Sequence, residues 1–120
     1  MPYYLEAMKR HKVVYLLGYP SAMSYLARVA HDRQLEAPQL LFVMGNAESL
    51  FASQREMLAK VFACPVYDSY GMAEIVAAGS GCEAGSLHIW PEVGMVEILD
   101  EHVDEPAPKG KSGRIVGTSL

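Results

Sequence analysis

Two short apolar runs, each stopped by a glycine and followed by a helical pattern, most constrain how this chain folds. The first run is Val13–Leu17, which precedes Gly18 and Pro20, and the second is Leu40–Met44, which precedes Gly45. Apolar runs of this length without alternation are typical of strands that are buried on both faces. The sequence therefore predicts two buried strands.

A helix is expected after each of these runs. Ser21 is a candidate N-cap for a helix that continues to about Gln34, and Ser49 is a candidate N-cap for the next one. The segment "CPVYDSYG" that follows the second helix reads as a third strand. Strands that alternate with helices predict parallel pairing with helices packed on the faces of the sheet.

The pattern changes after Gly79, where "SLHIW", "GMVEIL" and "GRIVGTSL" read as strands joined by turns. We expect a single α/β subdomain: a three-layer piece with a short parallel sheet and flanking helices over residues 1–78, followed by antiparallel strands over residues 79–120. The abrupt beginning, and an apparent strand that runs to Leu120, indicate a piece of a larger protein.

Composition excludes several classes of function. Ten basic and fourteen acidic residues give a formal charge of −4, and the basic residues are scattered, so no footprint for nucleic acid is present. No apolar run is long enough to span a membrane, and the N-terminus lacks the apolar core of a signal peptide. Two cysteines are too few for a disulfide framework, which favours a soluble cytoplasmic protein.

Glycines and polar residues follow all three predicted parallel strands, at Gly18–Ser21, Gly45–Ser49 and Asp68–Glu74. In a parallel sheet, ligands bind where the carboxyl ends of the strands meet. Ordinary turn chemistry also explains these residue types. Glu74 and Glu48 are suited to a divalent cation, although Glu48 equally suits the N-terminus of a helix.

The segment "YDSYGMAE" resembles the Tyr-Gly-x-Thr/Ala-Glu motif of the adenylate-forming ligase superfamily. Further features narrow the resemblance to one branch of this superfamily. They are the turn "GYPS", the loop "MGNAES", "VFACPVYDSYG", a cysteine followed by "LHI", the strand "GMVEILDE" and the closing strand. They are similar to the branch that contains phenylacetate–CoA ligases, coenzyme F390 synthetase and CapK-type proteins. The resemblance covers nearly the whole chain.

This resemblance implies a parent enzyme that activates a carboxylic acid with ATP and Mg²⁺ and usually passes the acyl group to coenzyme A. Aryl acids such as phenylacetate are the expected substrates. The phosphate loop of the family would lie before Met1, and its ribose-binding aspartate and catalytic lysine would lie beyond Leu120. Lys109 and Lys111 do not match that lysine. The chain alone is therefore expected to be inactive, and surfaces normally covered by the rest of the ligase are expected to allow oligomers.

The resemblance also assigns site residues. Tyr70 would stack against the adenine, Asp68 would accept a hydrogen bond from its amino group, Glu74 would bind Mg²⁺ with the nucleotide, and Gly71 and Met72 would border the acyl group. The remaining motif positions are Ser69 and Ala73, and the loop on the other side of the adenine is Gly45, Asn46, Ala47 and Glu48. Two positions depart from the family: Ala73, where Thr or Ser often touches the phosphate, and Asn46 or Ala47, where a second glycine is common.

Cys82 and His88 are candidate zinc ligands, with Cys64 as a third if the loop after Ala78 folds back. The alternative is that Cys64 and His88 only pack in the structure. Two other hypotheses for the whole chain remain open. One is a truncated, non-catalytic binding or assembly module with the same fold, and the other is an unrelated doubly wound domain that binds a nucleotide or another anion.

Overall fold

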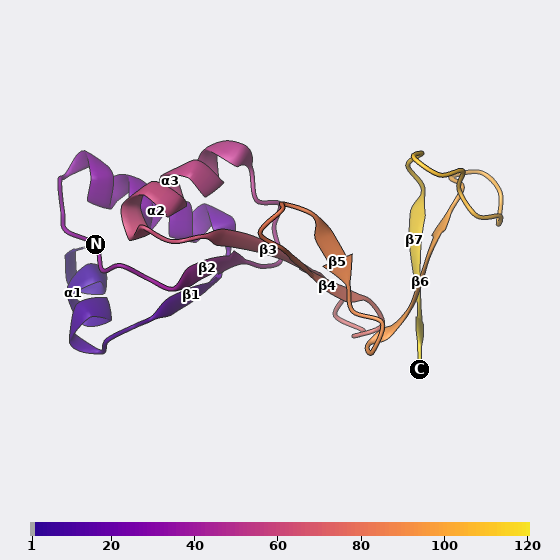
Figure 1. The fold of residues 1–120 in the computed structure, drawn as a ribbon, viewed down its shortest axis with the longest axis horizontal. Helices are drawn as coiled ribbons and strands as arrows, with labels where there is room; N and C mark the ends of the chain where they lie inside the picture. Colours follow the sequence, from indigo (N-terminus) through magenta and orange to yellow (C-terminus); the bar gives the residue numbers. More distant parts are fainter. Residues whose placement is uncertain (1) are drawn as a thin grey trace.

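The fold, a computed structural model that describes residues 2–120, combines a mixed sheet with three helices and a separate hairpin (Figure 1). The elements along the chain are α1 Pro2–Arg10, β1 Tyr15–Gly18, α2 Pro20–Asp32, β2 Phe42–Gly45, α3 Ala52–Phe62, β3 Val66–Gly71, β4 Ala78–Gly81, β5 Leu87–Ile89, β6 Gly94–Leu99 and β7 Arg114–Ser119. Within residues 2–120, no helix is both long and apolar enough to cross a membrane.

The main sheet has five strands in the order β1-β2-β3-β4-β5. β1, β2 and β3 are parallel to one another, whereas β4 and β5 continue the sheet with antiparallel pairing. β6 and β7 form a separate antiparallel pair. The predicted fold class, a short parallel sheet with flanking helices followed by antiparallel strands, is confirmed.

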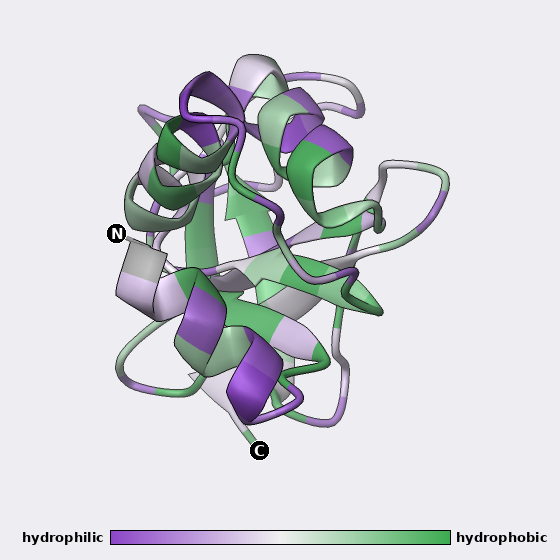
Figure 2. Ribbon diagram, turned by 90° about the vertical axis from the view of Figure 1, so that its left-hand side faces the viewer, coloured by the Kyte–Doolittle hydropathy of each residue, from purple (hydrophilic) through white to green (hydrophobic). Residues whose placement is uncertain are grey.

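The core lies between the parallel strands and the helices α2 and α3. Val43 of β2 and both Leu58 and Phe62 of α3 are fully buried, and Met23 and Ala27 of α2 pack into the same cluster. Figure 2 shows α2 and α3 above the sheet and α1 below it at the near end. The apolar stripe predicted on each of the two longer helices therefore faces the sheet.

The opposite face of the parallel strands remains open over Tyr15, Leu17, Phe42, Met44 and Tyr67, a set called the open face below. The register pairs Tyr15 with Phe42 and Leu17 with Met44, and Met44 pairs in turn with Tyr67. The rings of Tyr15 and Phe42 stack with centroids 5.1 Å apart, yet Tyr15 and Leu17 are 51% and 61% exposed. These strands were predicted to be buried on both faces, and in this chain one face is covered.

Both predicted N-caps are wrong. α2 begins at Pro20, and its N-cap is Tyr19, because proline suits the first helical position with its fixed φ and missing N–H. α3 begins at Ala52 rather than next to Ser49, and the amide of Phe51 donates to Oε1 of Gln54 at 3.0 Å. The segment after β2 is therefore a longer loop than the sequence indicates.

Candidate functional site

The carboxyl ends of the three parallel strands meet, as the sequence predicts. Gly18 lies beside Gly45, and Gly45 lies beside Asp68, in successive positions of the register. The amide of Asn46 donates to the Gly18 carbonyl at 3.0 Å, and the hydroxyl of Ser69 donates to the Gly45 carbonyl at 2.7 Å. The loop after β2 is thus tied to both neighbouring strands.

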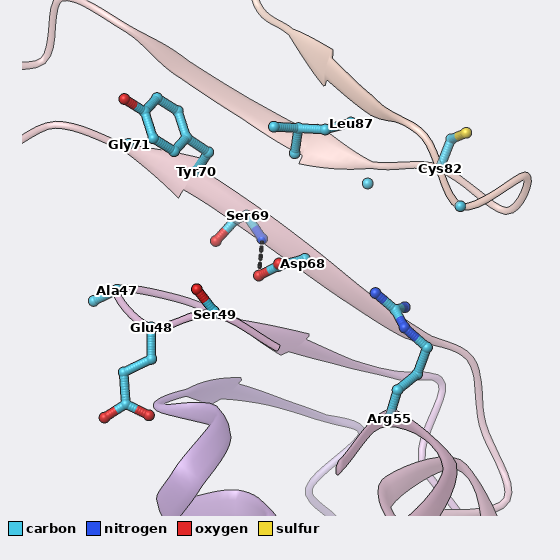
Figure 3. A pocket seen from close by; sticks show the side chains of 12 residues that line it. Ala47, Glu48, Ser49, Arg55, Asp68, Ser69, Tyr70, Gly71, Cys82 and Leu87 are labelled. Atoms are coloured by element: carbon cyan, nitrogen blue, oxygen red, sulfur yellow. Dashed lines mark hydrogen bonds between the residues drawn. The ribbon is translucent and has the colours of Figure 1, made fainter. Parts of the chain in front are cut away.

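A cleft of about 420 Å³ opens between this loop, β3 and the β4–β5 hairpin (Figure 3). The volume lies in the range that small-molecule sites occupy. Residues from the two predicted site segments share it with residues of the hairpin; its lining is Ala47, Glu48, Ser49, Arg55, Asp68, Ser69, Tyr70, Gly71, Gly81, Cys82, Gly85 and Leu87. Six of the eleven predicted nucleotide-site residues therefore border one cavity.

Asp68, Ser69, Tyr70 and Gly71 lie within β3, in the segment "CPVYDSYG" that was predicted as the third strand, and of the motif only Met72–Glu74 lie in the loop after it. The pairing of Tyr70 with Gly79 of β4 holds this segment extended. One carboxylate oxygen of Asp68, Oδ1, accepts a hydrogen bond from the amide of Ser69 at 3.0 Å. The strand therefore presents the motif on a rigid element rather than on a mobile loop.

Glu48 borders the cleft with its backbone side, but its carboxylate points away from β3 (Figure 3). One of its oxygens accepts from the amide of Ser21 and the other from the Ser21 hydroxyl, both at 3.0 Å. A carboxylate in this position offsets the positive end of α2. The residue suits a helix N-terminus, as one interpretation of the sequence held, although the helix is the preceding one.

Met72, Ala73 and Glu74 lie in the tight connection between β3 and β4, and none of them is among the residues that line the cleft. The side chain of Glu74 is exposed. Gly45 and Asn46 are also absent from the lining, and they act through the hydrogen bonds described above. The structure thus brings together the predicted adenine-side residues and leaves Glu74 at one end of them.

Arg55 is a cleft residue that the sequence analysis did not single out. Its guanidinium reaches from α3 into the cleft and donates to the carbonyl of Val66. The only available signal was its place, one turn into the helix that follows the Gly45–Ser49 loop. Arg55 is the one cationic side chain among the lining residues.

Cys82 and His88, the predicted zinc ligands, lie close together on the β4–β5 hairpin. Hydrogen bonds from the backbone of Ser86, the side chain of His88 and the backbone of Ala84 lower the pKa of the Cys82 thiol. Burial raises the pKa of Cys64 instead. Over residues 2–120, no three His, Cys, Asp or Glu side chains are grouped so as to hold a metal. Zinc therefore stays a prediction supported by two neighbouring side chains.

The fold of this chain is that of a part of acyl-CoA ligases. It is similar to 2-hydroxyisobutyryl-CoA ligase in complex with 2-HIB-AMP and CoA, with a TM-score of 0.80 and 22% identity over 98% of this chain and 26% of that one. It is also similar to a long-chain-fatty-acid-CoA ligase (FadD1) from Archaeoglobus fulgidus, with a TM-score of 0.74 and 14% identity over 96% and 26% of the two chains. Apo MatB from Rhodopseudomonas palustris matches with a TM-score of 0.68 and 19% identity over 99% and 25%.

The chain spans about a quarter of the length of these solved structures. No protein-family profile and no curated protein sequence matches it. At these sequence identities, the similarity to the solved structures establishes the fold of this chain.

Proposed function

We propose that this chain is the nucleotide- and acyl-binding part of an ATP-dependent acid–CoA ligase that forms an acyl-adenylate. The observation that carries the proposal is the cleft between the Gly45–Ser49 loop and β3, where the two segments of the ligase-like motif meet. The fold shared with acyl-CoA ligases supports it.

In this proposal the adenine binds between the loop and Tyr70. The flat ring of Tyr70 offers a stacking surface, and it lines the cleft from the interior of a strand. Asp68 keeps acceptor capacity for the adenine amino group, because a carboxylate accepts about four hydrogen bonds and its one partner within residues 2–120 is the Ser69 amide. Ser69 fixes the width of the cleft through its bond to the Gly45 carbonyl.

The residues present fit a magnesium ion that arrives with the nucleotide. Mg²⁺ is commonly held by one or two carboxylates plus substrate phosphates and water, and Glu74 supplies one exposed carboxylate just past the end of β3. Bound there, the ion would neutralise charge on the phosphates. Glu74 binds it, and Tyr70 and Asp68 orient the base.

The finer assignments rest on the sequence resemblance. The parent enzyme would convert a carboxylate and ATP into an acyl-adenylate and pyrophosphate, and then transfer the acyl group to coenzyme A. An aryl acid such as phenylacetate is the proposed substrate, with Gly71 and Met72 beside the acyl group. The chain alone binds nucleotide without turnover, because phosphoryl chemistry needs charge stabilisation from several sides.

Calorimetric titration of the 120-residue chain with AMP, and with ATP in the presence and absence of Mg²⁺, tests this function. Tyr70→Ala should weaken AMP binding by roughly 1–3 kcal/mol, the usual cost of losing an aromatic–base stack. Glu74→Gln should leave AMP binding unchanged and abolish the gain that Mg²⁺ gives to ATP.

Matched controls are Tyr3→Ala, which removes an exposed tyrosine on α1, and Glu56→Gln, which changes an exposed carboxylate on α3. Both should bind like the original chain. Failure of the folded original chain to bind millimolar AMP would refute the proposed function of the cleft.

A further inference from the structure

We infer that a glycine notch in the β6–β7 hairpin positions Glu74, acting through Val76. The notch consists of Gly94 on β6 and Gly117 on β7, and it receives the chain at Val76. The inference rests on the proposed role of Glu74 as a magnesium ligand, and it assigns to the distant hairpin a part in forming the nucleotide site.

The segment that carries Glu74 is a closed turn. The amide of Met72 donates to the Ala77 carbonyl at 3.2 Å, and the amide of Ile75 donates to the Met72 carbonyl at 3.0 Å. Ala77 is 1% exposed, so the segment is anchored at its end. Glu74 therefore lies between two fixed points of the backbone.

Ile75 shows that this turn is held in shape from outside. Its φ of 55° is in the left-handed region, which is a genuine outlier for a β-branched residue. Its side chain is 73% exposed and gains no compensating burial. Strained backbone of this kind persists only when the surroundings over-determine it, and it clusters at functional sites.

The notch supplies that outside constraint. A Cβ at Gly94 would clash with the carbonyl oxygen of Val76 and lie 2.7 Å from the carbonyl oxygen of Thr118. A Cβ at Gly117 would lie 2.8 Å from Cγ2 of Val76 and 3.1 Å from its carbonyl oxygen. The hairpin backbone can approach Val76 this closely because both positions are glycine and lack a Cβ. Val76 is thus clamped next to the strained residue, two positions from Glu74.

The consequence is that Glu74 is pre-organised rather than free. A metal ligand is oriented by the groups behind it, and loss of such groups typically weakens metal affinity 10- to 100-fold. Because the notch glycines contact Val76 and no residue of β6 or β7 lines the cleft, disturbance of the notch should affect magnesium and spare the adenine.

The test compares Gly117→Ala with the original chain in titrations with AMP and with ATP, each with and without Mg²⁺. We expect unchanged AMP affinity and a roughly tenfold loss in the gain that Mg²⁺ gives to ATP. Gly117→Ala combined with Val76→Ala removes Cγ2 from the contact and should restore part of that gain. Val103→Ala is the control, because it changes an exposed side chain in the loop that joins β6 to β7, away from Val76 and from the cleft.

Amide hydrogen exchange at Met72 and Ile75 gives a readout that needs no nucleotide. Both amides should exchange faster in Gly117→Ala and in Val76→Ala, a variant that keeps every glycine, while the amide of Val43 is unaffected. The original chain must first bind AMP and gain affinity for ATP from Mg²⁺. If Gly117→Ala and Val76→Ala then keep the full gain in ATP affinity, the notch plays no part in positioning Glu74. If the original chain binds neither nucleotide, the proposed function fails first and this inference fails with it.

Discussion

Ala47 is the residue at which the site loop departs most clearly from ideal geometry. Its φ of 62° lies in the left-handed region, where an L side chain costs roughly 1–2 kcal/mol relative to glycine. The sequence resemblance indicates a second glycine at this position or at Asn46. The structure assigns the glycine-like conformation to Ala47, so the loop follows the path that a glycine would take.

Ala47→Gly should therefore stabilise the chain. The relief of left-handed strain exceeds the extra entropy that glycine adds to the unfolded state, and we expect a gain of about 0.5–1 kcal/mol in the free energy of unfolding. Urea denaturation followed by circular dichroism measures it. Ala59→Gly, inside α3, is the control and should lose about 1 kcal/mol. Equal losses in both variants would contradict a left-handed Ala47.

Individual side chains of the cleft differ in how well the sequence predicts their positions. Asp68 and Tyr70 were expected near the Gly45–Ser49 loop because the carboxyl ends of parallel strands meet, and both segments do line one cleft. The direction of a side chain is not contained in such a pattern. Glu48 turns to Ser21, 27 positions away in the chain, and Arg55 enters the cleft from a helix face that was predicted to be exposed.

Among the elements, the β4–β5 hairpin brings a thiol to the rim of the cleft. Its turn is closed by bonds from the amide of Cys82 to the Ser86 carbonyl and from the amide of Gly85 to the Cys82 carbonyl, both at 2.9 Å. The same turn lowers the pKa of the Cys82 thiol through Ser86, His88 and Ala84, whereas burial raises that of Cys64.

Cys82 should consequently react with iodoacetamide before Cys64 does, because the thiolate is the nucleophile. The lowered pKa makes the reactive form of Cys82 present at a lower pH, and the raised pKa delays that of Cys64 to a higher pH. Mass spectrometry of the chain after alkylation at several pH values between pH 6 and pH 9 measures which of the two cysteines is modified first. His88→Ala should move the Cys82 profile toward higher pH, and an unchanged profile would show that the imidazole does not support the thiolate.

The β6–β7 hairpin should be the least stable element. Apart from Ala77, the buried apolar residues come from residues 5–66, and a two-stranded sheet alone is marginally stable in water. Native-state hydrogen exchange should show amides of β6 and β7 opening well below the global free energy, and amides of β2 opening near it. Uniform protection across both would contradict a hairpin that opens independently of the main sheet.

Element prediction failed where the local signal was weak. β4 reads "AGSG", which has no β-branched or aromatic residue, and pairing with β3 and β5 alone makes it a strand. The helix α1 was not predicted either, because Leu5 and Met8 are its only residues that reach the core and they give a short pattern. Tertiary contacts decide both elements.

At the scale of the whole molecule, the chain is unusually extended. It measures 52 × 26 × 22 Å with a radius of gyration of 17.4 Å, whereas a compact domain of this length has about 13.6 Å. Its accessible surface of 8355 Å² exceeds by roughly 1,900 Å² that expected of a compact protein of its size. Exposed apolar side chains lie on the open face and in the apolar groove between β5 and the β6–β7 hairpin.

Concentration-dependent association should follow from the exposed apolar residues of the open face, because contiguous apolar patches favour association. Sedimentation velocity should show oligomers at high concentration, and Leu17→Ser on the open face should reduce them. Val103→Ser, which changes another exposed apolar residue, in the loop between β6 and β7, is the control and should not reduce them. A strictly monomeric chain at millimolar concentration would show that the open face does not drive association.

The nucleotide is proposed to bind between the Gly45–Ser49 loop and β3. The most direct measurement is the change in backbone amide chemical shifts when AMP is added to isotopically labelled chain. We expect saturable shifts concentrated at Gly45–Ser49 and Asp68–Gly71, with α1 and the β6–β7 loop unaffected. Shifts confined to other surfaces, or none at millimolar AMP, would contradict it.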